Sequence, residues 1–338
     1  MNRPTLSLVI PVYNEEAVIP ELQRRLQTVL LSLSDLVESW EVIFVNDGSQ
    51  DASLDALKAC AELESRFKIL SLARNFGHQM AITAGLDRAQ GDAVVIMDAD
   101  LQDPPEVVRD MLLRWRSGFD VVYGVRLDRA GETWFKTATA ALFYRVTRAL
   151  VGVSIPADAG DFRLLSRPVV LALRALRERH RFVRSMVSWV GFRQTAIFYS
   201  RATRFAGETK YPLGDMIRFA IDGITSFSIV PLRFATWLGV FSGLVAVATS
   251  LWAVYLRLFT GGAAGTSATI VIVVALAAAA QLLMIGVLGE YIGRIYEEVK
   301  RRPLYITAEE TNFTTTESTA TRPSTSAAPK SVQRSHIQ

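Results

Sequence analysis

Apolar and polar residues alternate in a regular order over the first 124 residues of the chain. Short, continuous apolar runs such as LSLVIPV, EVIFV and AVVIM have the length and composition of buried strands. Between them, segments such as 15–33 and 51–64 place apolar residues at helical spacing. KILSL and DVVYG continue the series. Buried strands that alternate with helices predict an α/β fold with a mostly parallel sheet, covered on both faces.

The pattern becomes less regular after residue 124. GDFRLLS and QTAIFY predict two further strands, and apolar spacing predicts helices over 133–150 and 168–179. Residues 213–228 form an amphipathic pattern, with Asp215, Arg218 and Asp222 on one stripe. Such a helix, just before a long apolar run, is predicted to lie in a membrane interface. A helix packed on the globular domain is the alternative.

Two long runs near the C-terminus carry no charge. They cover residues 234–256 and 258–289, with Arg257 between them. A helix needs about 20 apolar residues to cross the hydrocarbon of a bilayer. Both runs therefore predict transmembrane helices. A buried helical hairpin in a soluble core is the alternative, but buried helices rarely lack charge over such a length.

The basic residues near these runs predict the orientation of the chain. Arg218 and Arg233 precede the first run, and Arg294 and 300–302 follow the second. Lys and Arg gather on the cytoplasmic side of membrane proteins. We therefore expect a multi-pass protein of the inner (cytoplasmic) membrane with both termini in the cytoplasm. The N-terminus shows no signal-peptide pattern, so we expect none.

These patterns predict a division of the chain into six parts. They are a cytoplasmic globular domain (1–210), an interfacial helix (211–232), two transmembrane helices (233–257 and 267–292), a cytoplasmic basic segment (293–310) and a disordered Ser/Thr-rich tail (311–338).

Composition and charge indicate which classes of ligand the chain is expected to bind. Hydrophobic residues make up 50% of the chain, the net charge is +4 and the pI is about 9.3. No long basic run is present, so anionic lipid headgroups and a phosphorylated substrate explain the charge better than nucleic acid does. The single cysteine, Cys60, excludes an internal disulfide and lies in a helical pattern. We expect it to be a packed residue.

The segment VVIMDADLQDPP places three carboxylates directly after the fourth predicted strand. In parallel sheets ligands bind beyond the carboxyl ends of the strands. Asp98 and Asp100 therefore suit a divalent cation, Mg²⁺ or Mn²⁺, that holds a diphosphate. Asp103, before Pro104 and Pro105, is well placed to cap a helix.

Other common sites lack their residues. No G-x-G-x-x-G follows the first strand and no G-x-x-x-x-G-K-[ST] occurs, which excludes the usual dinucleotide and NTP loops. The histidines are His78, His180 and His336, and they show neither metal-ligand spacing nor triad partners. We expect His78 and His180 to make structural or polar contacts.

Several motifs, in order along residues 5–305, resemble glycosyltransferase family 2, the inverting type. They are VIPVYNEE, FVNDGSQD, LARNFGHQMAITAGLDRAQGD, IMDADLQDPP and GDFRL. RFVRSMVSWVGFRQ, RFAGETKYPL and DGITSFS narrow the likeness to the polyprenyl-phosphate glycosyltransferases. The bactoprenol glucosyltransferase branch is most similar, and the dolichyl-phosphate mannose synthases are related. The resemblance implies a GT-A-like nucleotide-binding sheet.

The resemblance also implies roles for individual residues. The nucleotide-binding positions are Pro11, Tyr13, Glu15, Asp47 and Asp98. The metal-binding positions are Asp98, Asp100 and Gln102. Asp161 matches the proposed catalytic aspartate. The positions that handle the donor diphosphate and the lipid phosphate are Arg126, Arg201, Arg204 and Lys210.

The implied reaction is inverting transfer of a hexose to undecaprenyl phosphate, with glucose from UDP-glucose as the first choice. GDP-mannose, UDP-GlcNAc and UDP-aminoarabinose remain alternative donors, and the family implies a homotetramer. A processive polysaccharide synthase would have more spans and a Q-x-x-R-W motif, whereas Met111 precedes Arg114 and Trp115 here. A non-enzymatic membrane scaffold would not need the four aspartates at 47, 98, 100 and 161.

Overall fold

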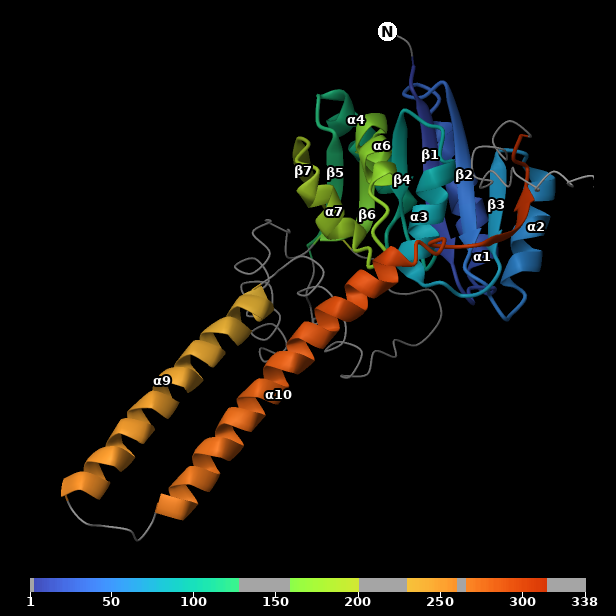
Figure 1. Cartoon of the computed structure of the whole chain (residues 1–338). Coiled ribbons are helices and arrows are strands. Elements are labelled where there is room, and N and C mark those ends of the chain that lie inside the picture. The colour runs from blue at the N-terminus through green and yellow to red at the C-terminus, as the bar shows by residue number, and fades with distance from the viewer. Residues whose placement is uncertain (1–2, 128–158, 201–229, 260–265, 315–338) are drawn as a thin grey trace, which may run out of the picture. The chain divides into compact units, whose positions relative to one another are not determined.

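The computed structural model describes residues 3–127, 159–200, 230–259 and 266–314 of the chain (Figure 1). The chain divides into two compact units. Unit 1 combines residues 1–99 with the C-terminal residues from 306, and unit 2 comprises residues 100–305. The single catalytic domain predicted over 1–210 is therefore shared between the two units.

Unit 1 is built on a parallel sheet. Its strands are β1 (Thr5–Val12), β2 (Ser39–Asn46), β3 (Phe67–Leu72), β4 (Ala93–Ile96) and β8 (Thr307–Thr311). The order is β4-β1-β2-β3, all parallel, and β8 pairs antiparallel with β3. The first four strands confirm the predicted series. Their side chains are almost wholly buried, as near-continuous apolar runs require.

Three helices connect these strands, close to the predicted positions. They are α1 (Ile19–Ser32), α2 (Ser53–Leu63) and α3 (His78–Arg88). Helix α3 packs on β1 and β2 at very short range. A Cβ atom added at Gly85 of α3 would lie 2.2 Å from Cγ1 of Val9. The glycine therefore lets the helix backbone approach the sheet. Cys60 is buried in α2, as expected of a packed residue.

Unit 2 contains three paired strands of mixed direction. Its elements are η1, a 3₁₀ turn (Pro105–Val107), α4 (Val108–Arg116), β5 (Val121–Arg126), β6 (Ala159–Ser166), α6 (Arg167–Ala175), α7 (Val183–Trp189) and β7 (Gln194–Tyr199). Strand β5 pairs antiparallel with β6 and parallel with β7. The predicted strands are confirmed, whereas α7 was not foreseen.

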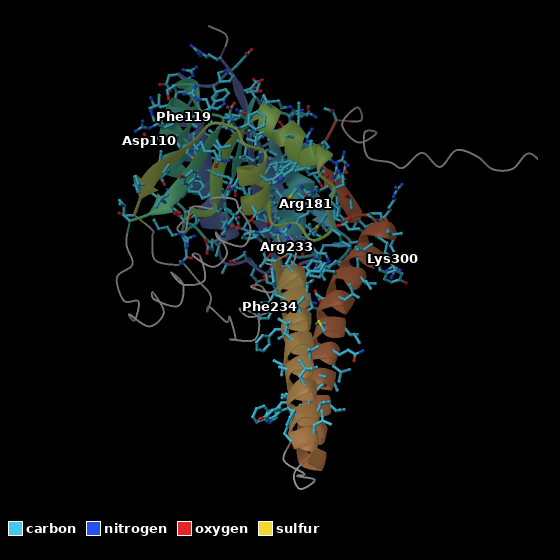
Figure 2. The ribbon with its side chains drawn as sticks, turned by 60° about the vertical axis from the view of Figure 1, so that its left-hand side comes forward. Asp110, Phe119, Arg181, Arg233, Phe234 and Lys300 are labelled. Carbon is cyan, nitrogen blue, oxygen red and sulfur yellow. The ribbon has the colours of Figure 1, made fainter. Side chains whose placement is uncertain are left out.

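Two long helices complete unit 2. Helix α9 (Val230–Phe259) and helix α10 (Thr266–Val299) pack against each other. Their apolar windows, Leu232–Trp252 and Leu276–Val299, are long enough to cross a membrane. Only 6% and 0% of these windows are buried in the described structure, and Figure 2 shows side chains projecting outward along both helices, from Phe234 onward on α9. A buried hairpin in a soluble core would not leave these side chains exposed.

Several predicted boundaries differ from the structure. Residues 230–232, assigned to the interfacial helix, belong to α9, and residues 293–299, assigned to the basic segment, continue α10. The helices expected over 133–150 and 213–228 lie outside the described residues.

The predicted start of the disordered tail at residue 311 is wrong, because the structure is ordered beyond this residue. Thr311 is the last residue of β8, and the next residue is tied to unit 1. The side-chain Nδ2 of Asn312 donates hydrogen bonds of 2.9 Å to the carbonyl oxygens of Ala61 and Phe67. Asn312 has a left-handed φ of 62°, which Asn tolerates better than most residues. An ion pair between Arg88 of α3 and Glu310 of β8 also attaches this segment to unit 1.

Replacing Asn312 by Ala should weaken the attachment of β8. Loss of both hydrogen bonds is expected to lower the free energy of unfolding of the full chain in detergent by about 1–3 kcal/mol, measured by denaturant titration. Glu309→Ala is the matched control, because its ion pair with Lys58 is exposed and should contribute about 0.5 kcal/mol or less. Equal effects of the two substitutions would contradict the tie described here.

Candidate functional site

The loops after β1, β2 and β3 of unit 1 are bound to one another. Asn14, with a left-handed φ of 56°, receives the backbone N–H of Gln50 on its Oδ1 at 2.8 Å. The Asn14 N–H donates to Oγ of Ser49 at 3.1 Å. A Cβ atom at Gly48 would lie 2.4 Å from the carbonyl carbon of Arg74. The carboxyl ends of these parallel strands therefore form one connected surface, where such sheets bind ligands.

Asp47 holds the loop that follows β3. Its carboxylate is 3% exposed and accepts the backbone N–H groups of Phe76 at 2.8 Å and of Gly77 at 2.9 Å. Burial raises the pKa of this carboxyl, while the two backbone donors and the nearby His78 act in the opposite direction. Gly77 has a φ of 97°, a conformation that L side chains rarely adopt.

The other residues predicted to bind the nucleotide also lie along these strand ends. Pro11 is buried in β1 opposite Val45 of β2, and Tyr13, just after β1, is 43% exposed. Glu15 is half-buried, and its N–H donates to Oγ of Ser53 at 2.8 Å. Asp98 follows β4, and its Oδ1 lies 3.5 Å from Nε2 of His78. This confirms a polar contact for His78.

The three predicted metal-binding residues, Asp98, Asp100 and Gln102, lie within the loop 98–102 after β4. Asp100 is nearly buried and accepts the backbone N–H of Gln102 on Oδ1 at 3.1 Å. The buried Leu101 between them has a left-handed φ of 58°, an unusual conformation that costs about 1–2 kcal/mol. Such strain is typical of functional sites. Among the described residues, no group of three or more His, Cys, Asp or Glu side chains is arranged to hold a metal.

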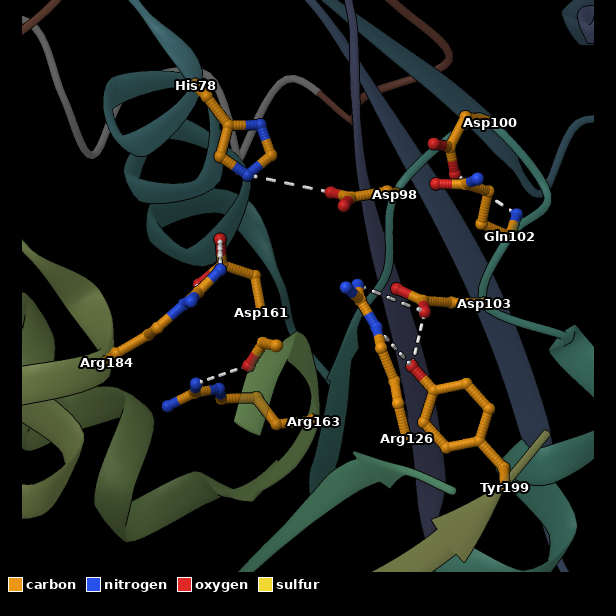
Figure 3. A network of polar contacts seen from close by, with 11 residues as sticks. His78, Asp98, Asp100, Gln102, Asp103, Arg126, Asp161, Arg163, Arg184 and Tyr199 are labelled. Atoms are coloured by element: carbon orange, nitrogen blue, oxygen red, sulfur yellow. Dashed lines mark hydrogen bonds and ion pairs between the residues drawn. The ribbon is translucent and has the colours of Figure 1, made fainter. Parts of the chain in front are cut away.

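A second cluster, in unit 2, surrounds Asp103 (Figure 3). The hydroxyl of Tyr199 donates a short hydrogen bond to Oδ1 of this buried carboxylate. Nη2 of Arg126 lies 3.7 Å from the same oxygen, and its Nε lies 3.4 Å from the Tyr199 hydroxyl. Burial, and then the Asp103 charge, raise the pKa of Tyr199, so it remains a donor at neutral pH. The predicted helix cap by Asp103 is wrong: Pro104 and Val107 occupy the N-cap positions of η1 and α4, and neither element has a side-chain cap. The Asp103 carboxylate is instead directed at Tyr199 and Arg126.

Small residues shape the space around this cluster. A Cβ atom at Gly124 would lie 2.7 Å from Cε1 of Tyr199, and one at Gly160 would lie 3.3 Å from Nη2 of Arg126. The ring of Phe162 packs edge-on against Tyr199, with centroids 5.5 Å apart. The backbone of β5 and β6 therefore fixes the positions of both side chains.

Asp161, the predicted catalytic residue, lies in a third cluster. Its carboxylate is 6% exposed and binds Arg184 through two bonds, Nε to Oδ1 at 2.8 Å and Nη2 to Oδ2 at 3.1 Å (Figure 3). Arg163, two residues along β6, is 3% exposed. Residues two apart on a strand share a face, so α7 brings Arg184 to the face that carries both of these charges.

Three predicted site residues lie outside the described part of the chain, and the structure shows polar partners that the sequence did not indicate. Arg201, Arg204 and Lys210 lie outside the described residues. The polar partners that the sequence did not single out are Tyr199, Arg163 and Arg184, and the sequence did not predict that Asp103 would bind Tyr199. The sequence contained a signal for Arg163, because residues two apart on a strand share a face and Asp161 was already a candidate. Arg184 and Tyr199 come from distant segments, and no local pattern pointed to them.

The parallel strands of unit 1, with acidic residues in the loops after them, and the strands of mixed direction in unit 2 have the GT-A-like α/β fold that the sequence predicts. The model of the family described as glycosyl transferase family 2 matches residues 7–173. The chain is 48% identical over 300 residues to the glycosyltransferase YkcC of Bacillus subtilis strain 168, covering 89% of this chain and 92% of the relative. The chain belongs to glycosyltransferase family 2.

Relatives with more specific names extend over the same length. The chain is 39% identical over 303 residues to the prophage bactoprenol glucosyl transferase homolog of Escherichia coli K12, covering 89% of this chain and 97% of the relative. Among solved structures, it is similar to the mannosyltransferase PcManGT from Pyrobaculum calidifontis in complex with GDP-Man and Mn²⁺. That structure is 17% identical, covers 86% of this chain and 88% of its own, and has a TM-score of 0.43, so it is too distant to indicate a substrate.

Asp47→Asn should loosen the loop at residues 73–77. An amide offers one acceptor oxygen where the carboxylate offers two, so one charge-assisted bond of about 1.5–3 kcal/mol is lost. We expect amide hydrogen exchange at Phe76 and Gly77 to accelerate about tenfold to a hundredfold. Asp92→Asn, which changes a carboxylate bound to Thr5 instead, is the control and should leave this exchange unchanged.

Tyr199→Phe should destabilise unit 2 by about 1–3 kcal/mol, because it leaves the buried Asp103 without its hydroxyl donor. Denaturant unfolding of the full chain in detergent measures this loss. Tyr123→Phe is the control, since this half-buried tyrosine lies on the neighbouring strand β5. If both variants unfold at the same denaturant concentration, the Tyr199 hydroxyl does not stabilise the cluster.

Proposed function

We propose that the protein transfers glucose from UDP-glucose to the phosphate of a polyprenyl lipid, undecaprenyl phosphate, at the cytoplasmic face of the inner membrane. The observation that carries this proposal is the 39% identity to a bactoprenol glucosyl transferase homolog over nearly the whole of both chains. The two exposed apolar helices, α9 and α10, support a membrane-bound acceptor.

The chemistry follows from the acceptor. A phosphate monoester is anionic near neutral pH, because its second pKa is about 6. One of its oxygens attacks C1 of glucose while the bond from C1 to the diphosphate breaks, and UDP leaves. Attack from the face opposite the leaving group inverts the anomeric centre, so an α-linked donor gives a β-linked lipid product. No proton has to be removed from the acceptor, so Asp161 is proposed to orient it or to stabilise positive charge on the sugar.

A divalent cation, Mg²⁺ or Mn²⁺, fits the residues of the 98–102 loop. Asp98, Asp100 and Gln102 supply only oxygen ligands, the kind that hard cations prefer, and such cations complete their shells with phosphate and water. The hydrogen bond from the Gln102 N–H and the left-handed Leu101 hold the Asp100 carboxylate in a defined turn. When bound, the cation would neutralise charge that develops on the diphosphate leaving group.

The remaining candidate residues are proposed to bind either the nucleotide or the phosphate groups. The nucleotide is proposed to contact the strand ends of unit 1 at Pro11, Tyr13, Glu15, Asp47 and Asp98. The phosphate groups are proposed to contact Arg126, Arg201, Arg204 and Lys210. The Asp103–Tyr199–Arg126 cluster supports this role for Arg126, because a guanidinium that is already fixed loses little entropy when it binds a phosphate.

The membrane-spanning arrangement follows from the lipid tail. Each methylene removed from the bilayer into water costs about 0.8 kcal/mol, so a long polyprenyl chain stays in the membrane and the enzyme must act at its surface. Helices α9 and α10 are proposed to anchor it there, with both chain termini in the cytoplasm, as the flanking Lys and Arg residues indicate. A homotetramer is proposed from the family resemblance.

Product analysis tests the proposed reaction. Membranes that contain the protein, supplied with undecaprenyl phosphate and one nucleotide sugar at a time, should yield a hexosyl lipid with UDP-glucose, detected by mass spectrometry. Product from GDP-mannose, UDP-GlcNAc or UDP-aminoarabinose instead would identify another donor. Long glycans made without the lipid would identify a polysaccharide synthase, and no product or binding with any donor would favour a non-enzymatic scaffold.

Removal of the cation tests the metal site. We expect EDTA to abolish transfer, added Mg²⁺ or Mn²⁺ to restore it, and Asp100→Asn to lower kcat at least about a hundredfold, since the loss of charge stabilisation on the leaving group affects the transition state. Asp110→Asn, on the exposed face of α4, is the control. Full activity of Asp100→Asn in the presence of chelator would exclude metal-dependent transfer.

A further inference from the structure

The carboxylate of Asp161 is engaged by an arginine. Both of its oxygens accept hydrogen bonds from Arg184, in the parallel, two-bond geometry that is strongest for this pair. A carboxylate held in this way is a poor base, since a proton would have to displace the guanidinium. A pair of this kind fixes the plane and the direction of the guanidinium instead. The Arg184 side chain itself is 30% exposed, whereas that of Asp161 is 7% exposed.

A second guanidinium lies behind this pair. Arg163 is buried, its Nη2 donates to the carbonyl oxygen of Gly160 at 2.7 Å, and its Nε has no hydrogen-bond partner in the described structure. The charged groups that act on it are one carboxylate, Asp161, and one further guanidinium, Arg184. Burial lowers the pKa of Arg163 to about 10, which still leaves it cationic at neutral pH. The guanidinium groups of Arg163 and Arg184 thus both lie near the Asp161 carboxylate, and the positive potential of two guanidinium groups favours the binding of an anion.

The chain just before α7 contacts the end of the second apolar helix. The backbone N–H of Arg179 donates to Oε1 of Glu298 at 2.6 Å, and Nε2 of His180 lies 3.0 Å from Oε2 of Glu297. Both glutamates lie in the last turn of α10, at the end of the apolar window Leu276–Val299. Arg184 follows His180 by four residues. Lipid phosphates lie just outside the hydrocarbon, at the level where a membrane-spanning helix ends.

We propose that Arg184 binds the phosphate of the lipid acceptor and that Asp161 is the positioning residue that holds Arg184 for this task. The inference rests on the proposed function, since it assumes a polyprenyl phosphate acceptor. The carboxylate of Asp161 accepts hydrogen bonds from Nε and Nη2 of Arg184. A guanidinium has five N–H donors in a fixed plane, so this pair fixes the direction of all of them. Arg163, which is 3% exposed, adds positive potential near the same carboxylate.

This assignment explains why an aspartate is needed in a reaction without proton abstraction. Two phosphate oxygens of the acceptor are held by Arg184, and the third attacks C1 of the sugar as the bond to UDP breaks. The electron pair moves from the attacking oxygen to C1 and from the breaking bond to UDP. The carboxylate of Asp161 stays bound to Arg184 throughout and exchanges no proton with the substrate.

The test separates acceptor binding from donor binding in steady-state kinetics with undecaprenyl phosphate and UDP-glucose. We expect Arg184→Gln to raise the KM for undecaprenyl phosphate about tenfold to a hundredfold, the loss expected for charge-assisted hydrogen bonds, with the KM for UDP-glucose unchanged. Arg184→Lys, which keeps the charge but not the planar fork, should show a smaller rise. Arg193→Gln is the matched control, because this exposed arginine stacks on Phe119 and should change neither KM.

Asp161→Asn distinguishes positioning from base catalysis. It should raise the KM for undecaprenyl phosphate as Arg184→Gln does, the double variant should be no worse than either single one, and the pH profile of kcat/KM should keep its shape. Inorganic phosphate should compete with the lipid in the wild type and lose this effect in Arg184→Gln. Thermal unfolding of each variant shows that it is folded.

Three results would overturn the inference while leaving the proposed reaction intact. They are a raised KM for UDP-glucose in Arg184→Lys, an unchanged KM for the lipid in Arg184→Gln, and loss of the acidic limb of the pH profile in Asp161→Asn. Failure of the wild-type protein to transfer any hexose to undecaprenyl phosphate would instead refute the proposed function itself.

Discussion

A buried carboxylate must be met by hydrogen-bond donors, and this constraint organises both units of the protein. Asp47, Asp103 and Asp161 are each less than 9% exposed, and an uncompensated charge in such a position would cost several kcal/mol. Each is met by a different kind of donor: two backbone N–H groups, a tyrosine hydroxyl with an arginine, and a guanidinium. These donors fix the loop after β3 and the side chains of Tyr199, Arg126 and Arg184.

The three carboxylates have different consequences because their donors differ. Backbone donors make Asp47 the attachment point of the loop that follows β3, beside the strand ends proposed to bind the nucleotide. Asp103 and Asp161, in contrast, each hold an arginine, so that negative charge inside unit 2 serves to direct positive charge. A family 2 enzyme that joins two phosphorylated substrates needs such directed cations, since both the leaving group and the proposed acceptor are anionic.

The C-terminal part of the chain contributes residues to each of the two units. The last turn of α10 contacts Arg179 and His180 of unit 2. Strand β8 then completes the edge of the unit 1 sheet beside β3, where an open strand would expose unpaired backbone groups. The residues that follow α10 are therefore part of the fold of unit 1.

The sequence by itself determined strands β1 to β7, most helices, the two apolar spans and the family, because these depend on local periodicity and on motifs of consecutive residues. It placed Asp98, Asp100 and Gln102 in one loop for the same reason. Only the tertiary structure paired Asp161 with Arg184 and Asp103 with Tyr199, and added β8 to β3. These contacts join segments 23 to about 240 residues apart, and no local spacing encodes which distant donor meets a buried charge.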